Sequence, residues 1–361
     1  MNTIWTRYVN NWQNLKVYSP GYQAIDWGFD YPQVVDLSTA LEQPTSIAVL
    51  PVYYNNPKDF AYKTEFDGLD LTQFDLVLFT DIEFRRQTDL INWIETTGAK
   101  NWLLTVGGLY SDETLDSRTI YRPAWMFTFL QWNPPREEFP MDRPFLWECL
   151  LGARREHRDF VMLSFQQSGL LDQSIVNYRN IFMGLRDHKV SLGVQQKFPG
   201  IEMQYPYVSP NLDPTWEVRG GKLDNTISSE VPWEIWNRCY YSIIIETLGD
   251  GNCFLAAEKI GKCVLARRLF VHFGASGWLA NLRMLGFETF DSVLDESYDS
   301  VTDKVQRWTQ AFEQVKALSK QNPQDILQKV RPVLDHNHNR LFQLRQEKFD
   351  AMRAMIESQL K

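Results

Sequence analysis

The chain has 361 residues, which is too many for one ordinary hydrophobic core, so we expect two domains, with a single large α/β domain as the alternative. Its composition, with 44% hydrophobic and 23% charged residues, is that of a globular protein, and no apolar run reaches the roughly 18 residues of a membrane-spanning helix. The net charge of −8 argues against a protein wrapped broadly in nucleic acid, although it leaves room for a local basic groove.

The cysteines and the N-terminus predict the cellular compartment. Cys149, Cys239, Cys253 and Cys263 form no C-x-x-C pair and have no histidine at a metal-ligand spacing, so we expect buried thiols rather than structural zinc. The N-terminus lacks a basic start followed by an apolar segment. We therefore expect a cytoplasmic protein with no membrane partner.

The first half of the chain predicts a Rossmann-like domain. Residues 1–44 are aromatic and rich in turn residues, which is typical of an arm or a cover. Further on, the pattern predicts a helix over residues 86–97. Apolar runs predict strands around it, at residues 45–52, 74–80, 101–106 and 124–131. Strand, helix and strand in succession indicate a parallel sheet.

Asp81 and Glu83 directly follow the predicted strand 74–80, with one residue between them, so both can face the same cleft. One interpretation is a catalytic base, and another is a D-x-E metal site like the D-x-D of metal-dependent sugar transferases. A third interpretation is that the two acids are only the solvated end of the strand. The prolines and charges of residues 134–144 then indicate a domain boundary.

The second half opens with a predicted anion site. An apolar strand, residues 145–151, leads through Gly152 into a segment with Arg154, Arg155 and Arg158 before a helical pattern. A strand that turns into a helix in this way presents free backbone N–H groups, and the arginines add positive charge, which suits a diphosphate. The following residues 186–230 predict a long irregular insertion.

A similar arrangement recurs over residues 240–299. The predicted strand 241–245 ends in Glu246 and is followed by Gly249, Asp250, Gly251 and Asn252. An acid at the carboxyl end of a strand, next to a glycine loop, is where α/β proteins bind ligands. The next residues, 254–268, predict a helix that carries Glu258, Lys259 and Lys262 within one turn and has a net charge of +3. This local reversal of charge again indicates an anion site.

Helical patterns continue to the end of the chain, over residues 299–320 and 323–360. The segment from His336 to Asn339 interrupts the second pattern. Because two histidines two residues apart do not share a helical face, we expect a helix junction there rather than a metal site.

Four separated motifs, in order, resemble a known family. They are LLGARREHRDF with GLLD (150–172), YYSIIIET (240–247), FLAAEKIGKCVLARRLFVHFG (254–274) and LRMLGFETFDSVLDESYD (282–299). Residues 145–310 resemble the donor-binding half of a GT-B glycosyltransferase, more narrowly the bacteriophage-type glycosyltransferases distantly related to the alpha-1,3-fucosyltransferases. The resemblance implies an α/β protein with two Rossmann-like domains facing a cleft. The expected domains are an acceptor domain with its arm (1–140), a nucleotide-sugar donor domain (141–310) and C-terminal helices packing back on the body (311–361).

The resemblance also implies residue roles. An arginine that contacts the nucleotide diphosphate corresponds to Arg154, Arg155 or Arg158, and the F-E-N segment of the family corresponds to Ile245, Glu246 and Thr247. The T-E-K motif corresponds to residues 257–259, with Glu258 holding the donor ribose and Lys259 pairing with the diphosphate; Ala257 departs from the threonine of the family. Lys262 is included with the nucleotide-sugar-binding residues. A carboxylate of the first domain serves as base, for which we favour Glu83 and place Asp81 second.

The expected activity is transfer of a sugar from a UDP- or GDP-sugar to an acceptor hydroxyl, with no other cofactor and no metal. Phe254 stands eight positions after Glu246, so the two glutamates typical of retaining GT-B enzymes are absent and inversion is favoured. The resemblance implies a phage origin, with the host cytoplasm as location, and this origin suggests DNA with modified bases such as 5-hydroxymethylcytosine as acceptor. Glycan or protein acceptors, a metal-dependent transferase, and a non-catalytic virion or host-interaction protein remain open alternatives.

Overall fold

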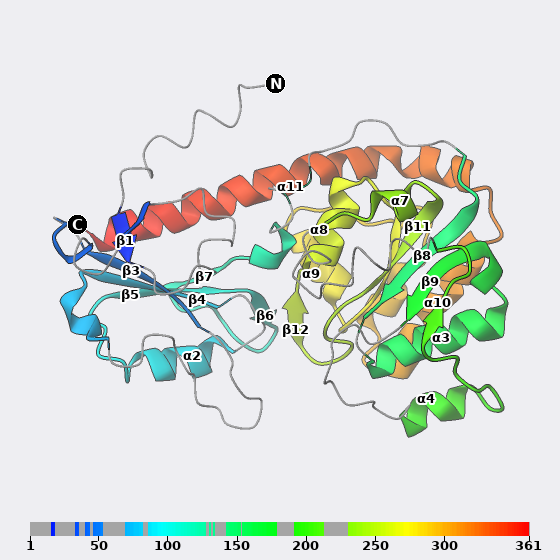
Figure 1. The fold of residues 1–361 in the computed structure, drawn as a ribbon, viewed down its shortest axis with the longest axis horizontal. Coiled ribbons are helices and arrows are strands. Elements are labelled where there is room, and N and C mark those ends of the chain that lie inside the picture. The colour runs from blue at the N-terminus through cyan, green and yellow to red at the C-terminus, as the bar shows by residue number, and fades with distance from the viewer. Residues whose placement is uncertain are drawn as a thin grey trace. The chain divides into compact units, whose positions relative to one another are not determined.

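The protein consists of two compact units, each with its own parallel sheet (Figure 1). The computed structural model describes residues 16–18, 33–35, 40–43, 46–52, 69–81, 86–127, 130, 133, 142–152, 154–178, 191–212 and 230–360. The first unit comprises residues 1–128 and 343–361, and the second comprises residues 129–342. An α/β protein with parallel sheets is thus confirmed, while the domain ranges 1–140, 141–310 and 311–361 stay a prediction.

The first unit contains a six-stranded parallel sheet of order β2-β1-β3-β4-β5-β7. Its strands are β1 (Lys16–Tyr18), β2 (Gln33–Val35), β3 (Ile47–Pro51), β4 (Leu76–Thr80), β5 (Trp102–Val106) and β7 (Thr119–Tyr121). The other elements of this unit are η3 (Leu71–Gln73), α2 (Gln87–Ile94), β6 (Gly108–Tyr110), η4 (Ala124–Met126) and the end of α11 (Pro323–Gln359).

Helices cover both faces of this sheet (Figure 1), which is why its central strand β4 is buried at every position and almost entirely apolar. On one face, Phe79 of β4 packs edge-on against Trp93 of α2, with 5.6 Å between the ring centroids. On the other face, Leu76 and Leu78 share a core cluster with Met352 of α11. The period-2 alternation of β4 therefore assigns successive side chains to α2 and to α11 in turn.

The second unit contains a five-stranded sheet of order β10-β9-β8-β11-β13, parallel except for the pair β10 and β9. The strands of this unit are β8 (Phe145–Leu151), β9 (Ser174–Tyr178), β10 (Tyr207–Val208), β11 (Cys239–Ile245), β12 (Cys253–Leu255) and β13 (Phe270–Phe273). Its helices are α3 (Glu156–Ser168), η5 (Leu171–Gln173), α4 (Leu192–Lys197), α7 (Trp233–Trp236), α8 (Glu258–Leu265), α9 (Trp278–Met284), η6 (Glu296–Ser300), α10 (Lys304–Leu318) and the first part of α11.

The two faces of this sheet differ in character. On the side of α3 and α10 (Figure 1), Trp147 of β8 lies 4.9 Å from Tyr241 of β11 and donates a hydrogen bond to Ser319, just after α10. On the side of α8, the buried Glu148 and Ser242 occupy paired positions, and Arg268 donates to Ser242 Oγ at 2.7 Å. Buried charged residues are not confined to this side, because Arg158 of α3 and Arg307 of α10 are buried as well.

Several predicted elements are confirmed, including the strands at 47–51, 76–80, 102–106, 145–151 and 239–245. The strand predicted over residues 124–131 is wrong, because Ala124–Met126 form the 3-10 helix η4 and the last strand of the sheet is β7. The helix predicted over residues 254–268 begins only at Glu258, after strand β12. The apolar run before Glu258 therefore belongs partly to a strand.

The helix junction expected from His336 to Asn339 is also wrong, because α11 runs without a break through these residues. Their side chains bond to loops of the same unit: Asn337 accepts from Glu288 N at 2.8 Å, and His338 Nδ1 lies 3.0 Å from Leu265 O. Polar residues in the middle of this helix thus serve tertiary contacts instead of ending it.

All four cysteines are free and buried, as expected. Of the 1–44 arm and the 186–230 insertion, the structure describes only parts, and the insertion includes α4 and β10. Most of residues 134–144, the predicted connector, lies outside the described residues.

Candidate functional site

The candidate site lies at the carboxyl ends of β8 and β11, which are parallel neighbours in the second sheet. β8 leads into α3, and β11 leads through the glycine loop, residues 249–252, and β12 into α8. Arg155, at the start of α3, donates from Nη1 to Thr247 O at 3.0 Å. The segment before α3 and the segment after β11 are therefore in direct contact.

Two helix N-termini belong to this edge of the sheet. Arg155 is the N-cap of α3 and Ala257 is the N-cap of α8, and neither makes a side-chain capping hydrogen bond within the described part of the chain. Both residues are extended, so the first N–H groups of each helix begin directly after a strand-like segment. Uncapped N–H groups and the positive end of the helix dipole favour an anion.

Basic side chains of α3 supply further positive charge. Arg158 is buried, and desolvation together with repulsion from Arg155 lowers the pKa of Arg158 to about 10, while Glu258 and Glu246 act in the opposite direction. Burial also lowers the pKa of Arg155. Since both guanidinium groups still carry a proton at neutral pH, two positive charges lie close together at the start of α3.

Arg154 has a different environment from the other two arginines. Its guanidinium binds Asp159, with Nε–Oδ1 and Nη2–Oδ2 distances of 3.2 and 3.4 Å, and lies 4.8 Å from the Tyr205 ring centroid. It also lines an open pocket of about 470 Å³ between α3 and α4, with Leu163, Gln195, Phe198, Tyr205 and residues 199–203. Arg154 is therefore already paired with a buried carboxylate, and we place it at the edge of the site.

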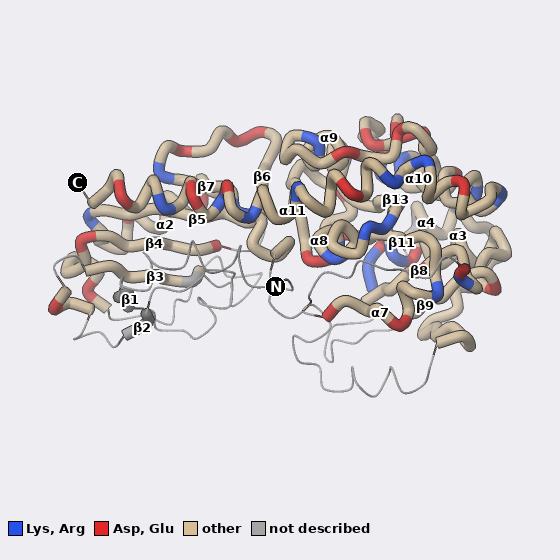
Figure 2. Tube along the Cα trace, turned by 90° about the horizontal axis from the view of Figure 1, so that it is seen from above, with Lys and Arg blue, Asp and Glu red and all other residues tan. Residues whose placement is uncertain are grey.

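The start of α8 carries both signs of charge (Figure 2). Lys259 Nζ lies 3.3 Å from Glu258 Oε1, and their side chains are 28% and 17% exposed. Burial raises the pKa of Glu258, but Lys259 and Lys262 outweigh this effect and leave it below its ordinary value. Glu258 is therefore ionised at neutral pH, and Lys259 is the basic residue of α8 that solvent and a ligand can reach.

Lys262 points to the interior of the unit. It is buried, and desolvation lowers its pKa to about 8. Glu258 raises this pKa, whereas repulsion from Lys259 lowers it further. Glu148 on β8 is also near enough to act on it. We conclude that Lys262 contributes to the positive potential under the site without meeting a ligand directly.

Glu246 directly follows β11 and is 1% exposed. Neither carboxylate oxygen has a well-aligned hydrogen-bond donor among the described residues, although the Thr247 N–H is near enough to favour the ionised form. Burial raises the pKa of Glu246 to about 7, with Glu258 acting in the same direction and Lys259, the Thr247 amide and Arg158 opposing it. Arg158, Glu246, Glu258 and Lys259 thus form one electrostatically coupled group.

The glycine loop is held from outside by α10. Arg307 is buried and donates to Gly249 O and Gly274 O at 3.2 and 3.0 Å, as well as to the carbonyls of residues 301 and 302. Trp308 Nε1 also donates to Gly249 O at 3.2 Å. Because one guanidinium joins the loops after β11 and β13, the path from Glu246 to α8 is fixed by the fold.

His157 closes the site from the side of α3. Its ring is buried, and Nε2 donates to Glu246 O at 2.8 Å, which assigns the ring proton to Nε2. A Cβ on Gly249 would come within 2.3 Å of His157 Nδ1, so only glycine fits beside this ring. Sequence reasoning missed His157 and Arg307; the histidine lies within the GARREHR motif, whereas no local signal marks the arginine.

The structure brings together Arg155, Arg158, Glu246, Glu258 and Lys259 from the predicted set. Asp81 lies in the first unit, is buried directly after β4, and its N–H donates to Thr105 O at 2.8 Å. Glu83 falls outside the described residues. The roles of Asp81 and Glu83 as bases or metal ligands therefore stay predictions.

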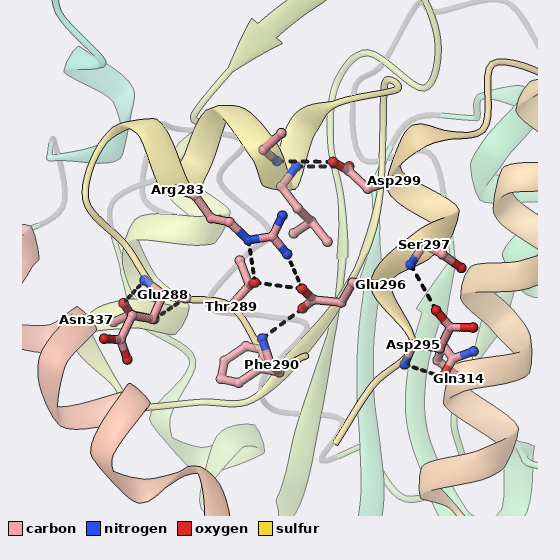
Figure 3. Close-up of polar contacts among 12 residues, drawn as sticks. Arg283, Glu288, Thr289, Phe290, Asp295, Glu296, Ser297, Asp299, Gln314 and Asn337 are labelled. Carbon is pink, nitrogen blue, oxygen red and sulfur yellow. Dashed lines mark hydrogen bonds and ion pairs between the residues drawn. The ribbon is translucent and has the colours of Figure 1, made fainter. Parts of the chain in front are cut away.

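The acidic residues of the motif at 282–299 hold the segment itself together (Figure 3). Glu296 accepts from Thr289 Oγ1 at 2.6 Å, from Phe290 N at 2.8 Å and from the Arg283 guanidinium. Asp299 accepts from the first N–H groups of α9, at Leu279 and Ala280. Because every one of these contacts is internal, this motif supports the fold of the second unit rather than the ligand site.

Comparison with protein-family models, curated proteins and solved structures gives no match. Within the described ranges, no helix combines the length and the apolar character that crossing a membrane requires.

Proposed function

We propose that the chain is a glycosyltransferase whose nucleotide-sugar donor binds with its diphosphate at the N-termini of α3 and α8. The observation that carries the proposal is the convergence of two uncapped helix N-termini with Arg155, Arg158 and Lys259 at the ends of adjacent parallel strands. Such a set of fixed donors and positive charges matches the four or more oxygens of a diphosphate better than a single carboxylate or phosphate.

The proposed chemistry is transfer with inversion, without metal. A carboxylate, for which Glu83 and then Asp81 are the candidates, accepts the proton of an acceptor hydroxyl. The acceptor oxygen forms a bond to the anomeric carbon of the donor sugar, and the bond from that carbon to the phosphate oxygen breaks. Its electron pair leaves with the nucleoside diphosphate, whose growing negative charge Arg155, Arg158 and Lys259 stabilise.

The GT-B arrangement of two Rossmann-like domains facing a cleft belongs to this proposal, as do UDP- or GDP-sugars as donors. The proposed acceptor is a hydroxymethylated pyrimidine in phage DNA, and a glycan or protein acceptor is the alternative. A chain with this fold but without activity, acting in a virion or at a host surface, is the rival from another class. These possibilities differ in what they bind, so they can be separated by titration and by transfer assays.

Titration calorimetry with UDP, GDP and their hexose conjugates tests the donor site. We expect the unmodified chain to bind at least one nucleoside diphosphate, and Lys259→Ala to weaken that binding by about tenfold or more, or roughly 1.4 kcal/mol. Lys316→Ala is the matched control, because Lys316 lies on the surface of the same unit, where it forms an ion pair with Glu313.

Failure of every nucleotide to bind the unmodified chain would contradict the enzyme proposal and favour the rival. Transfer of label from a bound donor to hydroxymethylated DNA, compared with unmodified DNA and with glycans, then identifies the acceptor class. Loss of that transfer in EDTA would favour the metal-dependent alternative at Asp81 and Glu83.

A further inference from the structure

The first turn of α3 contains two acids, Glu156 and Asp159, at the helix end to which we assign the ligand diphosphate. A carboxylate in the first turn of a helix is attracted by the same N–H groups and the same positive end of the dipole as a ligand phosphate. Because the negative charges compete for one place, an anion site at this helix end needs both carboxylates to be held by other groups.

Both carboxylates have such partners. Asp159 accepts from the Arg154 guanidinium, and its Oδ1 also accepts from the Tyr178 hydroxyl at 2.6 Å. Glu156 forms an ion pair with Lys304, which is the first residue of α10. Each acid in the first turn of α3 is therefore bound by a cation of its own.

Lys304 occupies a helix position where a positive charge is unfavourable, because it opposes the dipole of α10. Its Nζ binds Glu156 Oε2 at the start of α3 and lies 3.3 Å from Asp250 Oδ2 in the glycine loop. Glu156 and then Asp250 raise the pKa of Lys304, which therefore keeps its charge at neutral pH. This ammonium thus connects α10 to the two segments that carry the candidate site.

Glu156 is also held by the residue that precedes α4. Ser191 Oγ donates to Glu156 Oε1 at 2.6 Å, while Lys304 binds Oε2. Ser191 is the N-cap of α4 and accepts from Val194 N at 3.3 Å, so its own position is fixed. Both oxygens of Glu156 are thus engaged by other elements, and within the described residues neither accepts from an N–H group of α3.

We infer that Lys304 is a positioning residue of the diphosphate site, because by holding Glu156 it keeps a competing carboxylate from the N-terminus of α3. This inference rests on the proposed donor site and adds a residue that acts without touching the ligand. If the ammonium is removed, the freed carboxylate stays in the first turn of α3. There it lowers the positive potential that Arg155 and Arg158 provide and competes with the ligand for the N–H groups.

A double-mutant cycle tests this role, with inorganic pyrophosphate as the probe and titration calorimetry as the measurement. The four chains are the unmodified chain, Lys304→Met, Glu156→Gln and the double variant. We expect Lys304→Met to weaken pyrophosphate binding by about fivefold or more, the size of a charge effect at a helix end. We expect Glu156→Gln to change the affinity by less than about twofold on its own but to restore it nearly fully in the Lys304→Met chain, because the carboxylate competes only when it is released.

The cycle separates this role from two simpler ones. If Lys304 contributes only its charge, Glu156→Gln raises the affinity by the same factor with and without Lys304→Met, and this result overturns the inference. If Lys304 acts by anchoring the glycine loop, Asp250→Asn reproduces the loss and Glu156→Gln does not restore binding, which also overturns it. An unchanged affinity in Lys304→Met overturns it as well. In all three cases the unmodified chain still binds pyrophosphate, so the proposed donor site stands.

A second variant keeps the inference testable if Lys304→Met fails to fold. Ser191→Ala removes the other contact of Glu156 and leaves every charge in place, so we expect it to weaken pyrophosphate binding by about threefold, and Glu156→Gln to abolish this difference. A loss of the same size with and without Glu156→Gln, or no loss at all, contradicts the inference. An unmodified chain that binds neither pyrophosphate nor UDP nor GDP contradicts the proposed function, and the inference with it.

Discussion

At the scale of single residues, two buried histidines are kept neutral by the fold. Burial, with repulsion from Arg158, lowers the pKa of His157 to about 3. Burial and Arg307 hold the pKa of His272 well below its ordinary value, and the His272 ring stacks on Trp278 at 3.8 Å. Neither ring takes up a proton near neutral pH, so His157 can serve as a fixed donor to Glu246 O.

This arrangement predicts an acid-dependent loss of stability that His157→Gln removes. His157 takes a proton below about pH 6.5 in the unfolded chain but only below about pH 3 in the folded chain. The contribution of the neutral ring to the free energy of unfolding is therefore complete above pH 6.5 and is lost as the pH falls toward 3. The carboxyl of Glu246 has the opposite linkage between about pH 7 and 4.5, because its folded pKa is raised. The effect of His157 is therefore seen in the difference in the free energy of unfolding between His157→Gln and the unmodified chain.

Urea unfolding at pH 7.5, 6.5 and 5.5 measures that difference. We expect His157→Gln to be less stable at pH 7.5, and its deficit to shrink by roughly 1.4 kcal/mol per pH unit well below 6.5. His336→Gln is the control, because His336 is exposed on α11. A deficit that stays constant with pH would contradict a neutral buried His157.

The sequence indicated the charged residues of the site but not these supporting ones. Arg155, Arg158, Glu246, Glu258 and Lys259 follow strand ends in the sequence, and parallel neighbours bring strand ends together, so their grouping could be expected. Lys262 and Arg154 also belong to the predicted set, yet Lys262 points inward and Arg154 pairs with Asp159. Spacing along a helix does not determine which side chain is buried in the core.

At the scale of elements, the glycine loop depends on helices far away in the sequence. α3 supplies His157 against Gly249, and α10 supplies Arg307 and Trp308 to Gly249 O. The ring of His157 lies 5.8 Å from Trp308 and is bonded to Glu246 O, so it has little room to move. The loop conformation thus depends on the fit of one small residue.

Gly249→Ala should destabilise the protein through this contact. The new Cβ would lie 2.3 Å from His157 Nδ1 and 2.5 Å from Cγ, so the ring or the loop must shift, at a cost of about 1–3 kcal/mol in the free energy of unfolding. The control is Gly193→Ala in α4, where a Cβ has no atom within 4 Å and alanine favours the helix. Urea titration of both variants checks this, and a loss of the same size in each would show that the contact with His157 does not matter.

Helices and strands could be predicted where apolar residues recur at the period of that element. They could not be predicted where tertiary contacts determine the local structure. The strands 76–80 and 239–245 are buried at every position and mostly apolar, because helices cover both faces of each sheet. The apolar run at 124–131 has the same composition, yet it turns into η4 after β7. Polar residues at 336–339 suggested a break in a helix that tertiary hydrogen bonds instead keep continuous.

At the scale of the whole molecule, the last helix contributes to both units. Residues 323–342 of α11 belong to the second unit and residues 343–359 to the first. Met352 and Ile356 complete the core cluster of β3, β4, β5 and β7. An amphipathic pattern shows that a helix has an apolar face, but not which sheet that face covers, so this role could not be read from the sequence.

Met352→Ala should therefore weaken the first sheet selectively. Met352 is fully buried against strands of that sheet, and removing such a side chain costs about 2–5 kcal/mol. Met284→Ala makes the same chemical change at a position 80% exposed on α9 and should leave stability nearly unaltered. Hydrogen exchange read by mass spectrometry locates the effect: amides of β4 and β5 should exchange faster in Met352→Ala, while those of β8 and β11 keep their protection. Equal loss of protection in β8 and β11 would contradict the assignment of residues 343–361 to the core of the first unit.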